Sequence, residues 1–290
     1  MCTSYESTNP NDAAEAFSLF PEPDFDYPHE IYKDYVGPIF RGREGAYTTD
    51  PATFGLVPRK RIRPGIKLFD TMNARAETVG ERHNFKGAWR RLQFCLVPCR
   101  TFYEPNYETG RAVRWRIGLA DGAPLLVAGL WREWDTTKDA QPKDGDDASA
   151  SESETEEATA ADGGAETGEP GDGEGAQGTG DFRRAQRDFR ALGALRDGKA
   201  YSFTMLTVNA DEHPLMRRFH RPTDEKRSLV IVPPTEYESW LNCQSTEEAR
   251  SFLRLYPAEL MHAEPYPLPP RKPTKKQAGA APAKTQTDLF

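Results

Sequence analysis

One long stretch of this chain cannot join a hydrophobic core. Residues 136–180 consist almost entirely of Asp, Glu, Ser, Thr, Ala and Gly, with 13 acidic and 2 basic side chains. Such a stretch buries too little apolar surface to offset the entropy lost on ordering it. The sequence therefore predicts a disordered insert, either a solubilising loop inside one domain or a regulatory segment that competes with DNA for a basic face.

Outside this stretch, short apolar or alternating runs bounded by Gly and Pro predict β-strands. These runs are Ala52–Val57, Leu92–Val97, Val113–Leu119, Leu125–Trp131, Ser202–Val208 and Ser228–Val232. Helical patterns are fewer and cover Phe182–Leu195, Pro214–Phe219, Thr235–Leu241 and Thr246–Leu255. Strands and helices do not alternate as in βαβ units, so we expect an α+β fold on a mostly antiparallel, barrel-like β-sheet with flanking helices.

The chain length fits one domain with additions. We expect a domain over residues 2–262, interrupted by 136–180, and a disordered tail over 263–290. No apolar run approaches the roughly 20 residues of a membrane span, and the first residues do not resemble a secretion signal. The four cysteines have no metal-binding spacing. We therefore expect a cytoplasmic, nucleoid-associated monomer with no metal, no cofactor and no membrane contact.

The charge is distributed unevenly along the chain. The formal net charge is −7, but the sequence without residues 136–180 has 36 basic and 32 acidic side chains. Residues 41–100 alone have 13 basic and 5 acidic side chains. A basic surface suited to nucleic acid is therefore compatible with an acidic total.

Cys2 has a chemistry that no internal cysteine has. If Met1 is removed, Cys2 carries a free α-amine and a thiol on adjacent carbons. This pair can condense with an aldehyde to an imine and then close through sulfur to a thiazolidine ring. The α-amine titrates near 7.7–8.0, so a useful neutral fraction exists at cytoplasmic pH.

Three segments downstream of Cys2 carry a resemblance to a known family. Phe54–Pro58 is followed by Met72–Thr78, with the letters Asn-Ala-Arg-Ala-Glu-Thr, and then by Cys95–Pro98 leading to Phe102–Glu104. Together they resemble the SRAP family, the SOS-response-associated peptidases, also described as abasic-site processing proteins. The resemblance spans roughly residues 2–240. It implies that Cys2 is the nucleophile that links to an abasic site in single-stranded DNA.

The same resemblance implies roles for three further residues. Asn73 stands where the family places an amide beside the lesion, and an amide can orient the imine without titrating. Glu104, after Phe102 and Tyr103, is expected at a barrel rim, where partial burial suits a carboxyl to proton transfer. His220 matches the family's histidine before an apolar strand better than His213, and it can pass a proton to the opening sugar ring.

Two positions depart from the family pattern. The chain has Thr3-Ser4 where the family commonly has Gly-Arg, and Pro105 where it usually has Trp. The first change removes an expected phosphate contact near the lesion, and the second alters local packing or DNA contact.

Several basic residues are predicted to hold DNA. Arg75, two residues after Asn73, could bind a phosphate bidentately. The cluster of Arg59, Lys60, Arg61 and Arg63, or Arg90 and Arg91, could compensate for the missing arginine. Nearby Phe54, Phe69 and Trp89 could stack on bases or belong to the core.

The last five residues resemble the peptide by which bacterial repair proteins bind the sliding clamp. Gln286 would anchor one end by hydrogen bonds, while Leu289 and Phe290 would fill an apolar pocket.

The sequence is compatible with three functions. The first is covalent capture of abasic single-stranded DNA by Cys2 in the DNA damage (SOS) response, with strand cleavage by β-elimination as a side activity. The second is a thiol peptidase with Cys2 as nucleophile and His220 as base, acting on its own Met1. The third is a non-enzymatic, DNA-binding adaptor for the sliding clamp.

Overall fold

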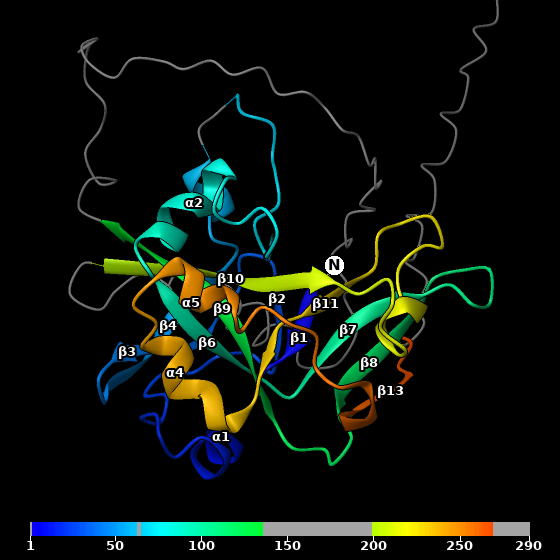
Figure 1. The fold of residues 1–290 in the computed structure, drawn as a ribbon, viewed down its shortest axis with the longest axis horizontal. Helices are drawn as coiled ribbons and strands as arrows, with labels where there is room; N and C mark the ends of the chain where they lie inside the picture. The colour runs from blue at the N-terminus through cyan, green and yellow to red at the C-terminus, as the bar shows by residue number, and fades with distance from the viewer. Residues whose placement is uncertain (1, 63–64, 136–198, 269–290) are drawn as a thin grey trace, which may run out of the picture.

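The computed structural model of the protein describes residues 2–62, 65–135 and 199–268. Five strands pair side by side into a closed barrel (Figure 1). They are β3 (Val36–Arg43), β4 (Ala46–Phe54), β6 (Phe94–Cys99), β9 (Leu125–Asp135) and β10 (Lys199–Asn209). Neighbouring strands are antiparallel except β4 and β10, which are parallel and close the ring.

Three short strands pair with parts of β9 and β10. β5 (Asn73–Arg75) pairs with β10 in parallel, beyond the point where β4 ends. β11 (Arg227–Leu229) pairs with β10, and β12 (Ile231–Val232) pairs with β9, both antiparallel. β5 therefore depends on β10 for its position.

A second, fully antiparallel sheet packs against the barrel. Its order is β13 (Met261–Pro265), β8 (Val113–Leu119), β7 (Thr101–Asn106), β1 (Ser4–Glu6) and β2 (Glu30–Tyr32). β1 joins β7 with Tyr5 opposite Phe102, so the first residues of the chain lie beside the strand that contains Glu104.

Short helices cover the outside of the barrel. They are α1 (Pro10–Ala16), α2 (His83–Arg90), α4 (Tyr237–Leu241) and α5 (Thr246–Arg250), which lie on the left of Figure 1, away from β7, β8 and β13. Four 3₁₀ turns complete the described elements: η1 (Arg59–Arg61), η3 (Met216–Arg218), η4 (Pro234–Glu236) and η5 (Ala258–Leu260). No described helix is long and apolar enough to cross a membrane.

The barrel strands are buried on both faces, and successive residues contribute to different cores. In β6, Phe94 and Leu96 pack outward with the helices, whereas Cys95 and Val97 point to the interior shared with the second sheet. Phe203 of β10 is fully buried in that interior and stacks on Phe54 at 5.1 Å between ring centroids. Two-sided burial explains why β6 and the first part of β9 are nearly continuous apolar runs in the sequence.

The predicted α+β class and the barrel-like sheet are confirmed, and each of the six predicted strands overlaps an observed one. Of the predicted helices, Pro214–Phe219 forms only a 3₁₀ turn, and Thr246–Leu255 is helical only to Arg250. The segments 136–180, 182–195 and 269–290 lie outside the described residues, so the insert and most of the tail stay predictions.

Replacing Phe203 with alanine should lower the free energy of unfolding by about 3–5 kcal/mol, because it leaves a cavity in the barrel interior. Urea denaturation measures the effect. The control Leu268→Ala, at a side chain that is 61% exposed, should change the free energy by less than about 0.5 kcal/mol. Equal values for both variants would contradict the placement of Phe203.

Candidate functional site

Cys2 lies buried just before β1, and two neighbours hold it there. Its thiol donates a hydrogen bond to the Ser4 carbonyl at 3.2 Å, and its own carbonyl accepts one from Asn73 Nδ2 at 2.7 Å. Burial raises the pKa of the Cys2 thiol, and the nearby Glu104 carboxylate raises it further. The thiol is therefore protonated at neutral pH.

Asn73 reaches Cys2 because β5 is anchored on β10. Asn73 lies opposite Met205, and the next residue, Ala74, is fully buried in the core under the helices. Side chains alternate along a strand, so Asn73 and Arg75 project to the other side. The Asn73 Oδ1 atom is buried and accepts no hydrogen bond within the described part of the chain. This oxygen is available to a group that enters the site.

Glu104 and His220 form a buried pair beside Cys2. Glu104 lies within β7 and His220 follows η3; they are 3% and 7% exposed, and His220 Nδ1 lies 3.5 Å from Glu104 Oε2. Burial lowers the pKa of His220, and the Glu104 charge only partly opposes this shift. His220 is therefore a neutral imidazole at neutral pH, able to accept a proton. Glu104 lies well inside the strand rather than at an open rim.

The backbone around His220 is held in a conformation that it would not adopt alone. His220 has φ of 63°, in the left-handed region that costs a non-glycine residue about 1–2 kcal/mol. Its N–H donates to the Pro105 carbonyl at 2.8 Å, and Asn106 Nδ2 donates to the Arg218 carbonyl at 3.0 Å. These two bonds fasten the His220 segment to β7.

His213, the alternative histidine, has a structural role. Its Nδ1 accepts hydrogen bonds from the N–H groups of Leu215 and Met216, at 3.2 and 2.9 Å. Its Nε2 lies 2.8 Å from the Tyr256 carbonyl and therefore carries the proton. Both ring nitrogens are thus occupied in holding η3. Of the two histidines, the structure places His220 beside Glu104.

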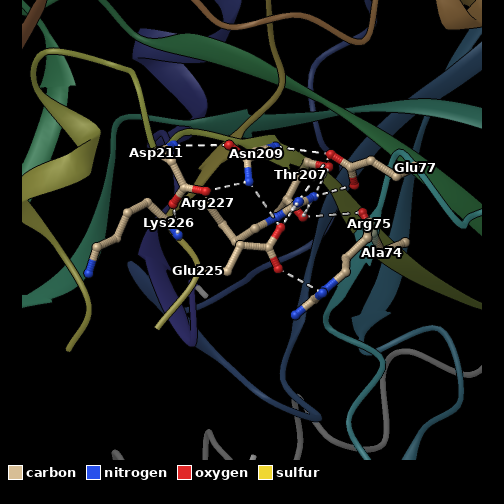
Figure 2. A network of polar contacts seen from close by, with 9 residues as sticks. All are labelled: Ala74, Arg75, Glu77, Thr207, Asn209, Asp211, Glu225, Lys226 and Arg227. Atoms are coloured by element: carbon tan, nitrogen blue, oxygen red, sulfur yellow. Dashed lines mark hydrogen bonds and ion pairs between the residues drawn. The ribbon is translucent and has the colours of Figure 1, made fainter. Parts of the chain in front are cut away.

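Arg75 belongs to a network of ion pairs at the end of β5 (Figure 2). Its Nη1 lies 2.7 Å from Glu225 Oε2, and the second oxygen of Glu225 lies 2.8 Å from Arg227 Nη1. Arg227 is almost fully buried and also binds both oxygens of Glu77, at 2.8 and 3.0 Å. Its Nη2 donates to the Thr207 carbonyl at 2.6 Å. Arg227 thereby ties β11, β10 and the segment after β5 together.

Nothing in the sequence marked Glu225 or Arg227 as part of a site. They follow His220 within a polar connection, and their spacing gives no sign that they contact Glu77 and Arg75, about 150 residues earlier. Only the pairing of β5 and β11 on opposite edges of β10 brings them together.

The predicted basic cluster is partly described. Arg59 and Lys60 on η1 are exposed, whereas Arg61 lies 5.1 Å from the ring centroid of Trp134. Arg59 also lies 3.8 Å from Asp34. Arg63 lies outside the described residues.

Base stacking by Phe54 and Trp89 is contradicted. Phe54 is fully buried in the barrel interior, and Trp89 is 2% exposed and packs edge-on against Phe94. Both rings fill the core because they lie on inward-facing positions of a strand and a helix, so neither can reach a base.

The two departures from the family pattern lie next to each other in the second sheet. Arg114 of β8 stands opposite Pro105, and its Nη2 lies 3.5 Å from Ser4 Oγ. Trp115 stands opposite Glu104 on the neighbouring strand. An arginine and an aromatic ring are thus present beside Ser4 and Pro105, supplied by β8. Among the described residues, no group of three or more His, Cys, Asp or Glu side chains could hold a metal ion.

Comparisons with known proteins agree with this fold. Residues 1–156 match the family model described as SOS response associated peptidase (SRAP). No functionally curated protein matches the sequence. Among solved structures, a protein from Bordetella bronchiseptica is 26% identical with a TM-score of 0.63, covering 92% of this chain and 100% of its own.

Two further solved structures share the fold at lower identity. A protein from Bacteroides thetaiotaomicron is 16% identical with a TM-score of 0.55, and the match covers 90% of each chain. A phage-related protein from Bordetella bronchiseptica is 17% identical with a TM-score of 0.51, covering 92% of this chain and 94% of its own.

The lowered pKa of His220 makes the fold sensitive to acid. As pH falls below the ordinary value of 6.5, the histidine is protonated in the unfolded chain before the folded one, so the free energy of unfolding decreases. The variant His220→Asn should lack the decrease in the free energy of unfolding that comes from protonation of His220. Asparagine is the chosen replacement because it tolerates the left-handed backbone at this position. Urea denaturation between pH 7 and about 5 measures the slope. The exposed-site control His262→Asn should keep the wild-type slope; an equally steep slope in His220→Asn would refute the assignment.

Proposed function

The chain belongs to the SRAP family of SOS response associated peptidases, and we propose that it captures abasic sites in single-stranded DNA through a covalent bond to Cys2. The observation that carries the proposal is the position of Cys2. Its carbonyl is held by Asn73 at 2.7 Å, and its thiol is buried beside the Glu104–His220 pair.

The reaction begins with the amine. After removal of Met1, the neutral α-amine of Cys2 attacks the aldehyde carbon of the ring-opened abasic sugar, and loss of one water gives an imine. The thiol sulfur then bonds to the imine carbon, while its proton ends on the imine nitrogen. The product is a thiazolidine ring, formed with the net release of one water and with no change in oxidation state.

The buried pair is suited to the proton transfers in this sequence. Opening of the sugar ring requires a proton to leave the C1′ hydroxyl and another to reach the ring oxygen. Neutral His220 can accept the first, and Glu104 at 3.5 Å can relay it. Asn73 has a buried amide oxygen that can accept a hydrogen bond from the Cys2 amine and so orient the adduct.

The state of the thiol favours this route over peptide hydrolysis. A thiol peptidase attacks with a thiolate, whose formation requires a lowered cysteine pKa. The pKa of Cys2 is raised instead, because the thiol is buried and lies near a carboxylate. An amine-first reaction needs no thiolate, since the protonated thiol can deliver its proton to the imine nitrogen.

A peptidase is the second candidate, and the family description favours it. Its simplest substrate is the bond between Met1 and Cys2. A purified protein that cleaves added peptides with turnover, and loses this activity in Cys2→Ser, would support it over DNA capture.

The proposal also assigns DNA-backbone contacts to basic residues and sliding-clamp binding to the C-terminal tail. Arg75, Arg59, Lys60 and Arg61 would hold the phosphate backbone, and strand cleavage by β-elimination from the imine would be a side activity. Gln286, Leu289 and Phe290 lie outside the described residues, and their binding to a sliding clamp is part of the proposal. The proposal further includes that the protein is monomeric and associated with the nucleoid.

The proposal predicts a Cys2-dependent crosslink. Incubation with single-stranded DNA that contains an abasic site should give a heat-stable protein–DNA band on a denaturing gel. Cys2→Ser should give none, because its hydroxyl does not form a comparably stable ring. The control Cys243→Ser should crosslink like the wild type, since a hydroxyl can replace that thiol in donating to the Ser239 carbonyl. Equal crosslinking by Cys2→Ser would end the proposal.

The chemistry also predicts that the purified protein lacks Met1. Intact-mass spectrometry of protein produced without an N-terminal tag measures this directly. A mass that retains methionine in a protein that still crosslinks would show that the α-amine of Cys2 is not the reagent.

A further inference from the structure

We propose that Glu225 occupies the phosphate-binding position of Arg75 in the free protein, so that single-stranded DNA binds by displacing this carboxylate. The inference rests on the proposed function, because it assigns Arg75 to the DNA backbone. It adds a residue that controls how tightly this site binds DNA.

The first support is the position of Arg75. It lies two residues after Asn73 on β5 and therefore projects on the same side as the amide that holds Cys2. Its side chain is 50% exposed, so it can contact a ligand without leaving the fold. A phosphate at this guanidinium would lie along the same face as the reacting residue.

The second support is the chemistry of the present partner. Glu225 Oε2 lies 2.7 Å from Arg75 Nη1, the distance of a charge-assisted hydrogen bond. A carboxylate oxygen and a phosphate oxygen compete for the same N–H donors, so DNA cannot take this donor while Glu225 holds it (Figure 2).

The third support is that Glu225 has a second partner. Its Oε1 lies 2.8 Å from Arg227 Nη1, and Arg227 is fixed by Glu77 and by the Thr207 carbonyl. When Arg75 turns to a phosphate, Glu225 stays paired with Arg227 and is not left without a cation. The exchange therefore has a low cost and leaves the network that anchors β5 in place.

The size of the effect follows from exposure. Glu225 is one-third exposed, and ion pairs at such positions change an equilibrium by at most about a fivefold factor. Free phosphate makes one contact with Arg75, and the competing Glu225 carboxylate weakens that contact. A DNA strand binds through many phosphates at once, so competition at one of them lowers its affinity less. Glu225 therefore favours binding of polyanions over binding of free phosphate.

A double-mutant cycle on non-covalent binding tests the inference. Full-length wild type, Glu225→Gln, Arg75→Gln and the double variant are titrated with a fluorescent single-stranded oligonucleotide that has no abasic site. Glu225→Gln should bind about two- to fivefold more tightly than wild type. Arg75→Gln should bind more weakly and reduce the slope of log affinity against log salt by about 0.7. With Arg75 absent, Glu225→Gln should no longer tighten binding.

The chain offers a matched control for the loss of one negative charge. Glu236 pairs with Arg254 at 2.5 Å, and the two side chains are 29% and 49% exposed, close to the 33% and 50% of Glu225 and Arg75. Glu236→Gln should change DNA affinity only by the small, non-specific effect of removing one negative charge, and so by less than Glu225→Gln does. Glu225→Gln should remain folded, because Arg227 keeps Glu77; thermal unfolding verifies this.

The outcomes separate this inference from the proposed function. Equal affinities for Glu225→Gln and Glu236→Gln would overturn the role of Glu225 even if Cys2 crosslinks DNA. A gain in affinity that persists without Arg75 would also overturn it. A gain that requires Arg75 supports it, and it does so even if no crosslink forms, a result that would refute only the Cys2 chemistry.

Discussion

Both edges of β10 are occupied, and this pairing positions Asn73 and Arg75 on one edge and Arg227 on the other. One edge pairs with β9 and then β11, and the other pairs with β4 and then β5. β4 uses only the first part of the 11-residue strand, so the remainder accepts β5 and brings Asn73 to Cys2. Pairing with β9 on one edge and β4 on the other closes the barrel, which removes the exposed edges that an open sheet would leave.

Burial gives the site its chemical character. Removal from water keeps the Cys2 thiol protonated and His220 neutral, because both charged forms lose solvation. A site of this kind is poorly suited to a reaction that starts from a thiolate. It suits one in which an amine attacks first and the adjacent Glu104–His220 pair passes protons. The left-handed backbone of His220 is the local cost of placing its ring against Glu104.

Charge acts at two levels in this protein. The total is acidic, yet the stretch 136–180 accounts for this excess, and residues 41–100 are strongly basic. At the end of β5, ion pairs link four side chains of alternating charge in the order Glu77, Arg227, Glu225 and Arg75. Arg75 is half-exposed, and its positive charge is therefore partly neutralised by Glu225, a carboxylate of the same network.

The α+β class and strands β4, β6, β8, β9, β10 and the β11–β12 region were predictable from the sequence, whereas the barrel strand β3 and strand β7 were not. The family resemblance alone grouped Asn73, Glu104 and His220 with Cys2. Strands β6 and β9 contain apolar runs that the sequence shows directly, and the segment from Asn73 to Thr78 is distinctive without any structure. Strands β1, β2 and β5 have three residues each, which is too short to show an alternating pattern, so no pattern predicts them. Phe54 and Trp89 could have been surface or core until packing placed them inside. Tertiary packing alone fixes the ion pair between Glu225 and Arg75 and the hydrogen bond from Asn73 to the Cys2 carbonyl. These contacts join residues far apart in the chain, and strand pairing on β10, not local pattern, brings them together.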